Sequence, residues 1–189
     1  MAAEPYKFGY VNASGEHAPF QYSNCWAIEK TKGPDRLIIA PAADHVEVMR
    51  RLTGAMRGPF GLLYVLVVLR GPHEAARYQS PAPLNSAQLD DFLAEFGDLL
   101  ENDARHHFWI SSIDNSGLLV YDNHNVVYAY GPLDAFEKIL LSNGLARSEN
   151  VTFPSPHVHS YNPEYDERVG QLLQHWSWIR FPLQDSDDR

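Results

Sequence analysis

The chain has 189 residues, of which 44% are hydrophobic and 21% charged, and its formal net charge is −9. These values predict a single globular domain over residues 1–183, followed by a disordered acidic tail over residues 184–189. The acidic charge argues against nucleic acid as a partner, because it repels phosphate backbones.

No basic segment followed by an apolar run stands at the N-terminus, so we expect no signal peptide. The longest apolar run, residues 62–69, is too short to cross a bilayer. The sequence therefore predicts a cytoplasmic protein without membrane contact.

The first half of the chain predicts a hairpin and then a helix. Residues 24–29 and 36–40 are typical of strands, and the turn residues Gly33-Pro34-Asp35 separate them. Apolar side chains then recur at three- and four-residue spacing, which predicts a helix over residues 41–56 with one apolar face formed by Val46, Met49, Leu52 and Met56.

A buried strand and a long helix follow. Residues 62–69 (LLYVLVVL) are apolar on both alternating sets, so we expect a central strand covered on both faces. Residues 71–85 hold three prolines and no periodicity, which predicts a loop. Asn85 and Gln88 form a capping-box pattern ahead of an apolar stripe, which predicts a helix over residues 86–102.

The second half predicts an antiparallel meander and two helices. Residues 106–112, 117–121 and 125–130 alternate as strands do, and short Asp/Asn-rich turns join them. Pro132 and Asn162-Pro163 each mark the start of a helix. The pattern predicts a single α+β domain with a mixed sheet of about six strands and four helices.

Cys25 is the one cysteine, so no disulfide can form within the chain, which favours a reducing compartment. The segment QYSNCWA around it resembles the nucleophile segment of papain-like cysteine proteases. The residues Tyr22-Ser23-Asn24 replace the glycine and first cysteine of that motif, and no Asn-Ser-Trp follows the downstream histidines. We therefore expect Cys25 to be a small buried hydrophobe and not a nucleophile.

The segment PSPHVHSY is the strongest candidate for a functional site. His157 and His159 alternate on a chain that prolines hold extended, so both imidazoles point the same way and could reach one zinc ion. A third ligand is needed, and His124 is one candidate; the others are His106, His107, Asp122, Glu164 and Asp166. The alternative is a loop in which these rings pack on aromatic side chains.

The turn between the last two meander strands is a second polar segment. Asp122 beside His124 suits acid–base chemistry, although such residues are also typical of turns. If this turn adjoins the histidine segment, one candidate pocket results, formed by Asp122, His124, His157, His159 and Tyr161.

Two functions stay open at this point. Four tryptophans and ten tyrosines favour a binding or regulatory protein that contacts another protein, or itself, through an aromatic face. The acidic charge would steer it toward a basic partner, such as a toxin or nuclease that it neutralises. The alternative is a metal-dependent hydrolase that uses His157 and His159.

Overall fold

The computed structural model describes residues 4–187, and its centre is a nine-stranded mixed sheet. All neighbouring strands run antiparallel except β10 and β3, which are parallel. In spatial order the strands are β10 (Ala146–Arg147), β3 (Cys25–Glu29), β4 (Arg36–Ala40), β9 (Val127–Tyr130), β8 (Leu118–Tyr121), β7 (His106–Ser112), β5 (Phe60–Leu66), β6 (Ala76–Gln79) and β12 (Ile179–Phe181).

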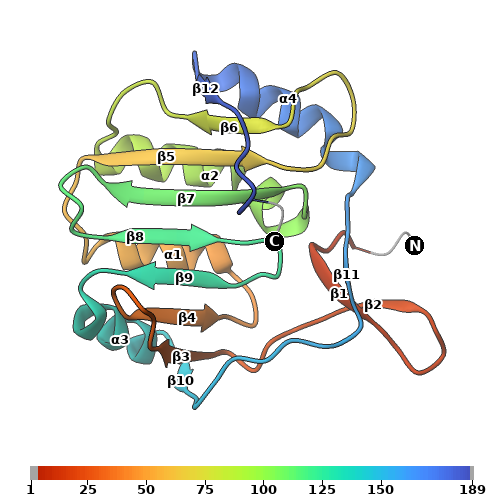
Figure 1. The fold of residues 1–189 in the computed structure, drawn as a ribbon, viewed down its shortest axis with the longest axis horizontal. Coiled ribbons are helices and arrows are strands. Elements are labelled where there is room, and N and C mark those ends of the chain that lie inside the picture. The colour runs from red at the N-terminus through yellow and green to blue at the C-terminus, as the bar shows by residue number, and fades with distance from the viewer. Residues whose placement is uncertain (1–3, 188–189) are drawn as a thin grey trace.

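Four helices complete this α+β fold: α1 (His45–Thr53), α2 (Ser86–Asn102), α3 (Leu133–Ser142) and α4 (Asp166–His175), the last preceded by a 3-10 turn, η1 (Pro163–Tyr165). The first three lie behind the large sheet, and α4 packs against α2 (Figure 1). None of the helices in residues 4–187 combines the length and the apolar character that a bilayer span needs.

The predicted helix over residues 86–102 is confirmed. Asn85 accepts a hydrogen bond from the Gln88 backbone, and the Gln88 side chain accepts one from the Asn85 backbone. This capping box satisfies donors that the first turn leaves free. The apolar stripe is fully buried against the sheet through Leu89, Phe92, Leu93, Phe96, Leu99 and Leu100.

The meander is also confirmed as β7, β8 and β9, but the strand before it differs from the expectation. Strand β5 ends at Leu66, and its Leu63 is only half-buried. Helices cover one face of the sheet, and within the described part of the chain the other face carries no helix (Figure 1). Residues 62–69 therefore do not form a strand buried on both sides.

Several boundaries and burials were also wrong. Residues 71–85 contain strand β6, because Ala76 and Tyr78 alternate inward in a stretch that looks aperiodic. The first helix is shorter than predicted, since Asp44 adopts a left-handed conformation just before it. His106 and His107, two of the candidate zinc donors, are buried within β7.

The tail also differs from the prediction. Residues 185–187 form a turn, and the carboxylate of Asp187 makes two hydrogen bonds to Arg77, at 2.7 and 2.8 Å. Its side chain is 3% exposed, so the chain through Asp187 is attached to the sheet. The last part of the predicted disordered tail, residues 188–189, lies outside the described residues.

A second, three-stranded sheet forms beside the large one (Figure 1). Its strands are β11 (His157–His159), β1 (Phe8–Val11) and β2 (His17–Pro19), in that order. Phe8 of β1 packs with Tyr22, Ala40 and Val126, so a separate apolar cluster joins the small sheet to the large one. The sequence did not predict β1 or β2.

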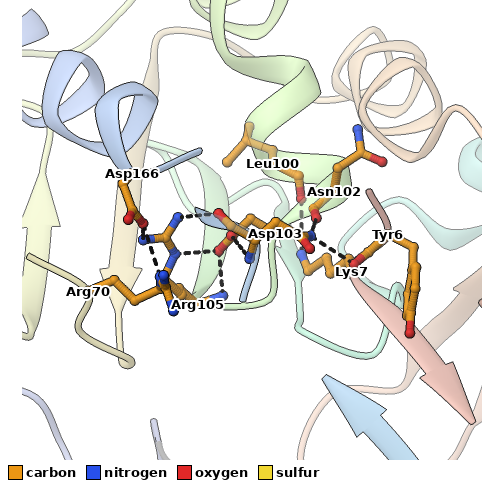
Figure 2. Close-up of polar contacts among 9 residues, drawn as sticks. Tyr6, Lys7, Arg70, Leu100, Asn102, Asp103, Arg105 and Asp166 are labelled. Atoms are coloured by element: carbon orange, nitrogen blue, oxygen red, sulfur yellow. Dashed lines mark hydrogen bonds and ion pairs between the residues drawn. The ribbon is translucent and has the colours of Figure 1, made fainter. Parts of the chain in front are cut away.

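A buried ion network fixes the chain just after β11 (Figure 2). We call it the Arg105 network: Asp103, Arg105, Asn162 and Asp166. Arg105 is 1% exposed and pairs with Asp103 at 2.8 Å and with Asp166 at 2.6 Å. The backbone of Asn162 donates to Asp103 at 2.9 Å. This network holds the segment that carries His157 and His159 against the end of α2.

Candidate metal centre

Three histidines from two separate sheets converge on one point. His157 and His159 project from β11, and His124 lies in the turn between β8 and β9. One ring nitrogen of each lies within 4.8 Å of the others. We call His124, His157 and His159 the histidine cluster. The two sheets thus contribute different ligands to one candidate site.

The Asp122 side chain organises the turn that presents His124. One carboxylate oxygen accepts the backbone N–H groups of His124 at 2.9 Å and Val126 at 3.0 Å. Asn125 takes a φ of 60°, which asparagine tolerates better than most residues. The Asp and Asn residues that predict a turn therefore also fix the direction of the histidine.

Hydrogen bonds leave the same nitrogen free on each ring. His124 directs Nδ1 at the second oxygen of Asp122, at 3.2 Å. His157 directs Nδ1 at the carbonyl oxygen of Pro154, also at 3.2 Å. In both rings Nδ1 then donates the hydrogen bond, so Nε2 is the nitrogen left to bind a metal ion. Nε2 of His159 is buried and has no hydrogen-bond partner among the described residues.

The electrostatics favour a neutral ring at His159. Burial, followed by the nearby His124 and His157, lowers the pKa of His159 to about 4. Burial acts to raise the pKa of Asp122, but the hydrogen bond and the charge of His124 outweigh it and hold that pKa below its usual value. His159 is therefore neutral near pH 7, which is the protonation state that a metal ion requires of a histidine ligand, and Asp122 places a carboxylate behind His124.

Two phenylalanines enclose the cluster. The buried ring of Phe8 lies 5.4 to 5.7 Å from the centroids of all three imidazoles. Phe153 stacks on His124 at 5.0 Å and is 46% exposed. Apolar walls of this kind lower the local dielectric and limit access of water.

The donor set fits zinc. Histidine nitrogens bind zinc at about 2.0–2.1 Å, so tetrahedral ligands stand about 3.3 Å apart. The separations here extend to 4.8 Å, so ion binding requires the rings to turn inward. The exposed His157 has room to do so. Three nitrogens would leave a fourth coordination position for water or another ligand.

Four of the five residues predicted for the pocket therefore lie together: Asp122 and the histidine cluster. Tyr161, the fifth, is 38% exposed and makes no hydrogen bond to these histidines among residues 4–187. Of the other predicted donors, Asp166 pairs with Arg105 and Arg70. Cys25 lies in β3 and is partly exposed, not buried as predicted.

Sequence reasoning missed the residues that support the site, namely Phe8, Phe153 and the Arg105 network. Phe8 pairs with His159 across β1 and β11, more than a hundred residues apart in the chain. No periodicity or spacing relates them, and only the apolar character of the N-terminal segment offered a signal.

Comparisons with protein-family models, with curated protein sequences and with solved structures found no match. We therefore infer function from the geometry of this chain.

Proposed function

We propose that the protein binds one divalent transition-metal ion, zinc by preference, through the histidine cluster. The observation that carries this proposal is the convergence of three ring nitrogens, with Asp122 orienting one ring and a backbone carbonyl orienting another. Imidazole donors suit zinc and its neighbours, whereas calcium and magnesium prefer oxygen ligands.

Isothermal titration with zinc, using protein without a histidine tag, tests this proposal. We expect one ion per chain in the wild type and no saturable site in His159→Ala. The matched control is His17→Ala, because His17 is exposed on β2 of the same small sheet. Equal zinc binding by the wild type and His159→Ala would contradict the proposal.

A hydrolytic function is the catalytic extension of this site. Three protein ligands leave a position at which zinc activates a water near neutral pH. We expect zinc-loaded protein to hydrolyse an activated ester, such as p-nitrophenyl acetate, with a rate that rises with pH through about 7. If the zinc-bound protein hydrolyses the ester no faster than the chelator-treated protein, the hydrolytic function is contradicted and metal binding alone remains.

A second candidate is contact with another protein or with a second copy of the chain, and the edge of the large sheet favours it. Strand β12 ends the sheet and, among residues 4–187, pairs only with β6. Its Ile179 and Phe181 are 43% and 44% exposed. An open edge with apolar side chains is a template for pairing with a further strand.

The aromatic residues give this second candidate less support than their number suggests. Trp26 is buried, and Trp176 and Trp178 pack against the core, which leaves Trp109 on the open face.

Sedimentation at several concentrations would test self-association. We expect Phe181→Asp to lower it, and Ile113→Asp, an exposed apolar position in the β7–β8 turn, to leave it unchanged. A monomer at all concentrations, together with no retained partner at low salt, would contradict this candidate.

A further inference from the structure

The face of the large sheet that lacks helices carries apolar side chains in register. Trp109 pairs with Val120, and Val120 pairs with Tyr128, so these three lie side by side on adjacent strands. Each is only partly buried, although the next residue along each strand is buried under the helices. This row forms an apolar floor.

A groove of about 590 Å³ lies over this floor. Leu118 and Tyr130 extend the floor toward one end, and the C-terminal turn forms a wall through Ser186 and Asp187. Its volume falls within the range of about 300–1,000 Å³ that is usual for small-molecule sites. No residue of the histidine cluster lines this groove, so the groove and the cluster are different features.

Each charged group at the groove already has a partner. Arg36 pairs with Glu29, donates to the Tyr130 hydroxyl and lies 4.3 Å over the Tyr128 ring. Asp187 makes its two hydrogen bonds to Arg77.

The third charged group, Asp122, accepts from two backbone N–H groups and from His124. An entering anion or cation would thus lose its hydration without gaining an unpaired counter-charge.

Uncharged hydrogen-bonding groups stand at the Asp187 end. The His107 ring lines the groove and makes no hydrogen bond within the described part of the chain. Burial lowers the pKa of His107, so the ring is neutral at pH 7. The exposed Ser186 lies on the same lining.

We propose that this groove is a second binding site, and that its ligand is a neutral small molecule with a flat apolar body and one hydrogen-bonding group. The body lies on Trp109, Val120 and Tyr128. The hydroxyl or amide of the ligand bonds to His107 or Ser186. This proposal does not depend on metal binding.

Three naphthalene probes of equal size and different charge test the proposal: 2-naphthol, 2-naphthoate and 2-naphthylmethylammonium. Titrations at pH 7 would be followed by NMR of the Trp109 indole and the Leu118 and Val120 methyl groups. We expect saturable shifts with 2-naphthol and affinities lower by about tenfold or more for the two ions, which lack a counter-charge.

Val120→Asp places a carboxylate on the floor and should weaken naphthol binding by about tenfold or more. Leu141→Asp is the control, because Leu141 is 58% exposed on α3. If Val120→Asp fails to fold, the NMR shifts that naphthol causes in the wild-type protein decide whether it binds on the floor. The proposal would be overturned by shifts that do not saturate, by shifts away from the floor, by ions that bind as well as naphthol, or by a folded Val120→Asp protein that binds it normally.

Discussion

The Arg105 network and the histidine cluster lie at opposite ends of one short segment, and their polar groups are arranged in opposite ways. In the Arg105 network opposite charges meet, so a buried guanidinium has two carboxylates (Figure 2). In the histidine cluster three like groups meet, and the Asp122 carboxylate contacts the ring of His124 alone among the three in the described part of the chain. A saturated buried network holds a structure together, whereas convergent nitrogen donors are what the proposed metal site requires.

This comparison teaches that burial of polar groups does not by itself identify a site. Arg105 and Asp103 are more deeply buried than any of the three histidines. The difference lies in pairing: the ionised groups of the network complete one another, but His159 keeps an unsatisfied nitrogen. Four experiments should break or sharpen the contrast.

Removal of Arg105 should have the largest effect. Arg105→Met leaves Asp103 buried without its counter-ion, and such a loss costs about 3–5 kcal/mol of the free energy of unfolding. Denaturant titration measures it. Arg50→Ala is the control, because its pair with Glu47 is exposed and contributes about 0.2–1 kcal/mol. A loss from Arg105→Met as small as that of the control would mean that the network is not structural.

Zinc should stabilise the folded protein by joining the two sheets. At free zinc a hundredfold above the dissociation constant, the expected gain is about 2.7 kcal/mol, since only the folded chain brings the ligands together. A rise in melting temperature measures this gain. His159→Ala should abolish the rise and His17→Ala should keep it. An equal rise in both variants would place the zinc elsewhere.

Asp122→Asn tests whether the carboxylate orients His124. The amide keeps an acceptor for the turn but weakens the contact with Nδ1, so zinc affinity should fall by about 10–100-fold. Asp114→Asn is a matched control, because Asp114 makes the same kind of bond in the other meander turn, to the Ser116 backbone at 2.9 Å. Unchanged zinc affinity in Asp122→Asn would show that Asp122 serves the turn alone.

His45 offers the smallest effect at neutral pH, and it separates a buried neutral histidine from a metal ligand. Burial, followed by the charge of Lys7, lowers its pKa from 6.5 to about 3. The unfolded chain therefore binds the extra proton between these values, and stability falls as pH drops from about 6.5 toward 3, by at most about 1.4 kcal/mol per pH unit.

His45→Phe preserves the stacking on Tyr121 and should flatten this slope, as measured by denaturant titration across the window. Zinc affinity at pH 7 should not change. A slope identical to that of the wild type would show that other groups cause the acid sensitivity.

The sequence by itself determined the local elements of this protein. Neighbouring residues determine the cap, the apolar stripe and the end of the helix over residues 86–102. Asp and Asn residues likewise determine the turns of the meander. The alternation of His157 and His159 also predicts that both rings face one side. Interactions between residues that are close in the chain determine the helix, the turns and the alternation, so the sequence predicts all three.

Only the tertiary structure decided which residues of the two sheets meet. The approach of His124 to His159 depends on the pairing of β1 with β11 and on the packing of Phe8, and both join segments that are distant in the chain. The burial of His106 and the capture of Asp187 by Arg77 depend on the same long-range contacts. Such contacts depend on how the surfaces of distant segments pack together, and a local sequence pattern does not predict that packing.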